Sequence, residues 1–125
     1  MDSAIRRGVL ILGTATLLCY GAPKASFRQQ WQTFTATAYS IEGTTASGKQ
    51  TVEGLTVAAD PAILPVGTKI QVRGAGPYSG IYTVQDTGPK IRGREIDIFI
   101  TPAAEAKRFG KKRVLVRVLR PAHKE

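Results

Sequence analysis

The 125-residue sequence contains little cysteine, histidine or acid. A single Cys and a single His exclude a disulfide framework, and also a zinc site built from these residue types alone. No charge-free apolar run reaches the roughly 18 residues of a membrane-spanning helix. Nine Asp and Glu stand against eighteen Lys and Arg, so the formal net charge is +9. Such a chain is attracted to polyanions: nucleic acid, an anionic membrane surface or an acidic cell-wall polymer.

The N-terminal segment differs in composition from the rest of the chain. Two arginines precede an apolar run over residues 9–20, and small residues follow it. A basic start, a short apolar middle and a small-residue end are typical of a secretory signal peptide. We therefore expect residues 1–26 to be a signal peptide without a clear cleavage site, and residues 27–125 to be the exported domain. A buried N-terminal helix and a lipoprotein modified at Cys19 are the alternatives.

Removal of this segment changes the charge only slightly. It takes away three cations and one of four aspartates, which leaves a formal charge of +7 on the exported domain. No stable membrane span then remains, and we expect the protein in the periplasm, the cell envelope or outer membrane, or secreted. That location and the lack of a helix-turn-helix pattern argue against a nucleic-acid partner.

Short β-rich runs, broken by turn residues every 8–12 positions, predict a sandwich or a barrel. Six runs of β-branched, aromatic or alternating residues are candidate strands: residues 33–40, 55–59, 68–73, 81–85, 95–100 and 113–119. One short helix is expected over residues 103–109, with Thr101 as its N-cap, Pro102 at its first position and Gly110 after its end. The sequence therefore predicts a mainly β fold, a small closed barrel of six strands with one short helix.

The exported domain keeps three aspartates, and each has a structural explanation beside a chemical one. Asp60 and Asp86 lie in turn-rich settings, where an aspartate often accepts backbone N–H bonds. Asp97 lies inside a predicted strand, and its side chain points away from Ile96 and Ile98. Large apolar neighbours partly desolvate such a carboxyl, which raises its pKa and equips it to donate a proton near neutral pH.

The three carboxyls could also act together. If the strands bring them close, mutual repulsion raises at least one pKa further. Such a cluster suits cleavage of a glycosidic bond, in which an acid protonates the leaving oxygen. The competing use is a hard-cation site, although the spacing is not that of a calcium loop. These residues alone leave both uses open.

Six short motifs follow one another in a fixed order along the chain. They are Thr35-Ala36-Thr37-Ala38-Tyr39, Thr45-Ala46-Ser47-Gly48, Val57-Ala58-Ala59-Asp60-Pro61, Leu64-Pro65-Val66-Gly67-Thr68-Lys69, Asp86-Thr87-Gly88, and Ile91-Arg92-Gly93 through Ile96-Asp97. As an ordered set they resemble the 3D domain family, named for its three aspartates. The resemblance covers roughly Thr35 to Leu119 and implies a double-psi β-barrel, shared with the membrane-bound lytic transglycosylase A catalytic domain and with rare lipoprotein A.

The resemblance also implies an activity, that of a peptidoglycan lytic transglycosylase in cell-wall turnover. Such an enzyme cleaves the bond from N-acetylmuramic acid to N-acetylglucosamine and leaves a 1,6-anhydro sugar, because the sugar's own hydroxyl replaces water as the nucleophile. The third family aspartate falls on Asp97, which we expect to act as acid and then base. Asp60 and Asp86 fall on the other two, and we expect them to bind substrate, stabilise the oxocarbenium ion or tune Asp97. Three further motif positions are expected sugar contacts: Tyr39, Thr45 and Lys69.

The sequence departs from the family pattern in one loop. Pro89-Lys90 stands where many members have Gly-Ala, and Arg92 stands where they have lysine. The pair Gly88-Pro89 is similar to rare lipoprotein A, but Lys49 occupies the place of a glutamate in that relative. The alternative function is therefore a non-catalytic glycan-binding module like the expansin and barwin relatives of this barrel. In either case we expect a monomer that binds peptidoglycan glycan strands and needs no cofactor or metal ion.

Overall fold

The computed structural model describes residues 30–122, so the predicted signal peptide lies outside the described residues. The described part contains six strands and one α-helix, with a single 3-10 turn. In chain order the elements are β1 (Gln32–Tyr39), β2 (Thr56–Ala59), β3 (Lys69–Arg73), η1 (Gly76–Tyr78), β4 (Gly80–Asp86), β5 (Glu95–Phe99), α2 (Ala103–Phe109) and β6 (Lys112–Arg120). Each predicted strand is present, and every boundary lies within one residue of its expected place. In this part of the chain, no helix is long and apolar enough to cross a membrane.

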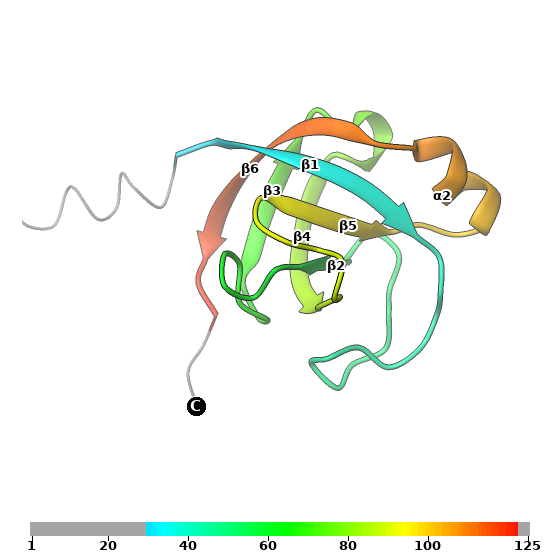
Figure 1. The fold of residues 1–125 in the computed structure, drawn as a ribbon, viewed down its shortest axis with the longest axis horizontal. Coiled ribbons are helices and arrows are strands. Elements are labelled where there is room, and N and C mark those ends of the chain that lie inside the picture. Colours follow the sequence, from blue (N-terminus) through cyan, green and yellow to red (C-terminus); the bar gives the residue numbers. More distant parts are fainter. Residues whose placement is uncertain (1–29, 123–125) are drawn as a thin grey trace, which may run out of the picture. The chain divides into compact units, whose positions relative to one another are not determined.

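The strands close into a barrel in the order β1-β5-β2-β4-β3-β6 (Figure 1). The pairs β1/β5 and β2/β4 are parallel, whereas the other four pairs are antiparallel. This mainly β, closed six-stranded arrangement with one helix confirms the predicted fold class. Because the barrel is closed, none of its six strands is left as an open edge.

The barrel interior is filled by side chains that alternate along each strand. Ile70 and Val72 of β3 point inward, as do Val114 and Val116 of β6, and each is at most 2% exposed. The residues between them face outward, as the period of two in a strand requires. The same alternation in β5 buries Ile96 and Ile98, so Asp97 faces the outer surface of the barrel wall.

The helix α2 follows β5, and Figure 1 shows it at one end of the barrel. Its bounds are those expected, and Gly110 ends it with a positive φ of 68°. The predicted cap was wrong: Pro102 occupies the N-cap position, and no side chain caps the helix. The hydroxyl of Thr101 accepts no hydrogen bond from a helix N–H, and it donates one to Glu53 in the long loop between β1 and β2.

That long loop, residues 40–55, is held against the barrel by specific hydrogen bonds. The N–H of Ser47 donates to the carbonyl of Gln85 at 3.0 Å, and the N–H of Ala46 donates to the carboxylate of Asp86 at 3.0 Å. Within the buried wall, the Thr56 hydroxyl donates to the Gln85 side chain at 2.5 Å. The loop is therefore fixed beside the end of β4, where it forms one side of a cavity.

Candidate active site

Strand register places four side chains in a row across four neighbouring strands. Thr37 of β1 pairs with Asp97 of β5, Asp97 pairs with Ala58 of β2, and Ala58 pairs with Asp86 of β4. A β-bulge between Val57 and Ala58 shifts the last of these pairings. Because neighbouring strands lie about 4.8 Å apart, the two aspartates stand roughly 10 Å apart with a small alanine between them.

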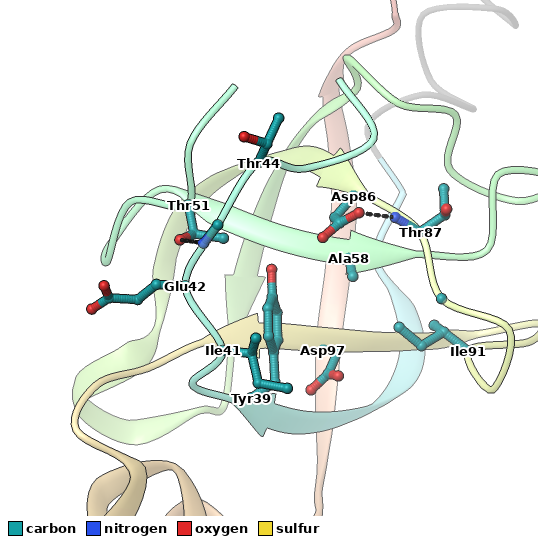
Figure 2. Close-up of a pocket in the computed structure, with 12 residues that line it drawn as sticks. Tyr39, Ile41, Glu42, Thr44, Thr51, Ala58, Asp86, Thr87, Ile91 and Asp97 are labelled. Atoms are coloured by element: carbon teal, nitrogen blue, oxygen red, sulfur yellow. Dashed lines mark hydrogen bonds between the residues drawn. The ribbon is translucent and has the colours of Figure 1, made fainter. Parts of the chain in front are cut away.

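Three members of this row, Asp97, Ala58 and Asp86, line a cavity of about 330 Å³ on the outer surface of the barrel wall. Ala58 lies between the two aspartates, and Tyr39 stands alongside (Figure 2). Loop 40–55 contributes one side, and the segment after β4 contributes the other. The complete lining is Tyr39, Ile41, Glu42, Gly43, Thr44, Thr51, Ala58, Asp86, Thr87, Gly88, Ile91 and Asp97.

Asp97 is the partly buried acid of the site. Its Oδ1 accepts a hydrogen bond from the Thr37 hydroxyl at 3.0 Å. Burial raises the pKa of Asp97 above its ordinary value, and the Thr37 hydrogen bond, which favours the carboxylate, opposes part of that rise. Both the direction of the shift and its cause, burial, agree with the sequence prediction for Asp97, whereas repulsion between aspartates is not among the causes of this shift. A carboxyl of this kind holds its proton to a higher pH than an exposed one.

Tyr39 ends β1 beside both carboxyls. Its ring meets the edge of Phe99 with centroids 5.5 Å apart. Burial, together with the negative charges of Asp86 and Asp97, raises the pKa of Tyr39 to about 12. Its hydroxyl is buried and has no hydrogen-bond partner among the described residues. A buried donor without a partner is costly, so this group is suited to meet an acceptor atom that a ligand brings.

Asp86 has a different environment from Asp97. Its Oδ1 accepts two backbone N–H bonds, from Thr87 at 2.9 Å and from Ala46 at 3.0 Å. The bond to Ala46 ties loop 40–55 to the end of β4. Asp86 therefore lines the cavity and also holds one of its walls in place. Its backbone hydrogen bonds agree with the turn role expected from the sequence, and its place in the cavity leaves it available to a substrate.

Asp60 lies outside the cavity lining and acts as a clamp between two loops. Its Oδ2 accepts the N–H of Gly93 at 2.7 Å, and its Oδ1 accepts the N–H of Ala62 at 3.0 Å. These bonds lower the pKa of Asp60, with Arg92 adding a smaller effect. Gly93 has a φ of 67°, a conformation that other residues rarely adopt, so its N–H reaches Asp60 at little cost. The structure thus brings two of the three aspartates into one cavity and gives the third a supporting position.

Two expected sugar contacts also lie outside the cavity lining. Thr45 is buried, and its hydroxyl donates to the carbonyl of Lys49 at 2.7 Å, which stabilises the turn of loop 40–55. Lys69 begins β3, where its register partners are Thr83 and Arg120. Their roles as substrate contacts stay predictions.

Sequence reasoning missed Thr37 and Ala58 as members of the site. Thr37 lies two residues before Tyr39 on β1, so the period of a strand alone puts both on one face. Thr37 lies beside Asp97 because β1 pairs with β5, and no local sequence pattern predicts that pairing. Within residues 30–122, no group of three or more His, Cys, Asp or Glu side chains is placed to hold a metal ion.

Two curated proteins of Bacillus subtilis (strain 168) are similar to this chain in sequence. "Cell wall-binding protein YocH" is 38% identical over 95 residues, which cover 70% of this chain and 32% of that protein. "Putative cell wall shaping protein YabE" is 34% identical over 90 residues, which cover 69% of this chain and 21% of that protein. The chain therefore spans about a third or less of the length of these relatives.

The barrel is also similar to a solved structure, and the sequence matches a family model. MltA from Escherichia coli, whose crystal structure is described as revealing a unique lytic transglycosylase fold, aligns with a TM-score of 0.54 at 26% identity. The aligned part covers 68% of this chain and 29% of MltA. The family model described as "3D domain" matches residues 55–120, which are more than half of the sequence and include Asp60, Asp86 and Asp97. The resemblance read from the motifs is thus confirmed, and the chain belongs to the 3D domain family.

Proposed function

We propose that this protein is an exported, peptidoglycan lytic transglycosylase-like enzyme that cleaves glycan strands in the cell envelope. The observation that carries the proposal is Asp97, a half-buried carboxyl with a raised pKa in a cavity that it shares with Asp86. The barrel shared with MltA and the cell-wall names of the two relatives support a substrate in the wall. The expected signal peptide supports the location.

The chemistry requires one group to give and then take a proton. Asp97, which holds its proton to a higher pH because burial raises its pKa, donates that proton to the glycosidic oxygen as the bond from that oxygen to C1 of N-acetylmuramic acid breaks. The resulting Asp97 carboxylate then takes the proton of the sugar's 6-hydroxyl. The oxygen of that hydroxyl bonds to C1, and a 1,6-anhydro end forms. No water is consumed, and Asp97 returns to its starting state.

The neighbouring groups fit supporting roles in this scheme. Two backbone N–H bonds hold the Asp86 side chain in position, and its carboxylate stabilises the positive charge that develops at C1. The small side chain of Ala58 leaves space between the carboxyls for the sugar ring. Thr37 holds the Asp97 side chain in one orientation and favours its carboxylate form, which is the form needed in the second half of the reaction.

A second function is supported by a specific observation. One relative is named a cell wall-binding protein, and the chain spans only a third of it. A barrel of this size could therefore bind glycan without cleaving it. A binding module should keep its affinity in Asp97→Asn, as an enzyme should, but it should show no turnover in either form.

The test is mass spectrometry of the products that the purified protein releases from purified peptidoglycan. Anhydro-muropeptides are the expected products. Muropeptides with reducing ends would mean that water, and not the sugar hydroxyl, is the nucleophile. Release of no products by a protein that sediments with the wall would contradict the enzyme proposal and support the binding module.

A further inference from the structure

A second surface of the barrel is strongly cationic. The strands β3 and β6 contain six basic residues and no acidic residue. They are neighbours in the barrel, and the cavity lies on the wall formed by β5, β2 and β4 instead. Four of the six basic side chains alternate with the buried apolar residues and so belong to the outward positions. We call these four the cationic wall: Lys69, Arg73, Arg113 and Arg117.

Two of these cations are stacked on one aromatic ring. The guanidinium carbon of Arg73 lies 4.1 Å from the centroid of the Trp31 ring, and that of Arg117 lies 4.7 Å from it. The Nε of Arg117 also donates to the Gln71 side chain at 3.0 Å. Stacking fixes both guanidiniums while their in-plane N–H groups stay able to donate, and that fork geometry matches phosphate oxygens.

Among residues 30–122, none of the four residues of the cationic wall forms an ion pair with an acidic side chain. Among the described residues, the ion pair is between Glu105 and Arg108 on α2, away from these strands. Like charges held close together repel each other, and an anionic partner would relieve that repulsion. Arg113 and Arg117 are four residues apart, a span of about 13 Å along a strand, which suits a repeating anion better than a single small one.

From this arrangement we infer that the cationic wall binds a phosphodiester-linked anionic polymer of the cell envelope. A membrane surface is less favoured, because the Trp31 ring, which would otherwise enter a bilayer interface, is covered by two guanidiniums. The inference rests on the proposed envelope location but not on cleavage. Binding at this wall would hold the protein in the envelope while the opposite side of the barrel carries the cavity.

Trp31 gives a direct readout, because it is the only tryptophan in the chain. Titration of the purified protein with poly(glycerol phosphate) should change the Trp31 emission, and added salt should reverse the change by screening. Inorganic phosphate at the same phosphate concentration should have little effect. Asp97→Asn should bind the polymer as the wild type does, so failure of the cleavage proposal and failure of this one are separable.

Paired variants test the location of the site. Arg73→Gln with Arg117→Gln should weaken polymer binding at least tenfold. Lys90→Gln with Lys107→Gln removes the same charge from exposed positions outside β3 and β6 and should change polymer binding less than twofold. Lys69→Gln with Arg113→Gln leaves the Trp31 stack intact and should also weaken polymer binding. This second wall pair shows whether the loss in the first pair comes from lost charge or from misfolding. Equal losses in the wall and control pairs, or tighter binding to phosphatidylglycerol vesicles than to the polymer, would overturn the inference.

Discussion

At the scale of residues, each aspartate of the domain meets a different set of hydrogen-bond donors. Asp60 and Asp86 each accept two backbone N–H bonds, whereas Asp97 accepts one hydroxyl bond and is partly buried. The backbone donors lower the pKa of Asp60, whereas burial raises the pKa of Asp97. These environments therefore leave Asp97 as the aspartate suited to carry a proton to a substrate.

The buried carboxyl should cost stability when it ionises. Its pKa is higher in the folded state than in the unfolded chain, so the folded state binds more protons and stability falls as pH rises above the unfolded value. Asp97→Asn keeps an oxygen acceptor for Thr37 but cannot ionise. We expect the variant to unfold at a higher temperature than wild type at pH 7, and the difference to disappear at pH 3. A lower unfolding temperature at pH 7 would contradict this account of the raised pKa.

Thr37 should tune the acid through its single hydrogen bond. Thr37→Val removes the donor that favours the carboxylate, so the pKa of Asp97 should rise further. The rate of cleavage, which falls as a general acid loses its proton, should then fall at a higher pH than in wild type. The matched control is Thr33→Val on the same strand, which pairs with Leu115 and should leave the pH profile unchanged. An unshifted profile in both variants would remove Thr37 from the mechanism.

At the scale of elements, the site depends on how β2 lies between β5 and β4. Ala58 is the residue of β2 that lies between the two carboxyls. Its side chain is buried and forms part of the cavity lining. A larger side chain at this position would extend into the cavity and not into the barrel core, since Val57 and Ala59 face inward. One face of β2 therefore lines the cavity, and the other face packs in the barrel core. A substitution on the cavity face should affect substrate binding more than stability.

Ala58→Leu tests this separation. The leucine should fill the space between Asp97 and Asp86 and weaken glycan binding roughly tenfold or more, while the unfolding temperature changes little. Ala104→Leu, on the exposed face of α2, serves as a control for added apolar volume. Glycan binding by Ala58→Leu as tight as that of wild type would mean that the sugar does not enter this cavity.

Asp60 should stabilise the loop between β4 and β5 without taking part in the chemistry. Asp60→Ala leaves the N–H of Gly93 without its acceptor, and hydrogen exchange at that amide should become faster. Because the pKa of Asp60 is lowered in the folded state, its contribution is present above pH 3.8 and is lost as pH falls through the folded value. The unfolding temperatures of wild type and variant should therefore converge in acid. A gap that is independent of pH would argue against the clamp.

The elements were more predictable than their pairing. Alternation in residues 68–73 and 113–119, together with the turn residues between runs, identified these strands, because the core imposes a period of two on each. The parallel pairing of β1 with β5 and the bulge at Ala58 joined distant segments by long-range contacts, which no local pattern records. For this reason Asp97 was predictable as an acid, whereas its partner Thr37 was not.

At the scale of the whole molecule, the closed barrel presents two chemically different walls. One holds the cavity with its two carboxyls, and the other holds the arginines stacked on Trp31. Composition predicted the excess of positive charge, but only the strand order shows that β3 and β6 are neighbours and concentrate it. The net charge can be counted from the sequence, but where the charges gather on the barrel depends on which strands are neighbours.

The proposed function depends on one carboxyl, that of Asp97, performing the cleavage. Its most direct test is the rate at which wild type and Asp97→Asn release anhydro-muropeptides from the same peptidoglycan, with sedimentation of each protein on that wall measured in parallel. We predict that the variant sediments as the wild type does and loses about 10²–10⁴-fold in rate. Release by Asp97→Asn at the wild-type rate, or no release by either protein, would contradict the claim.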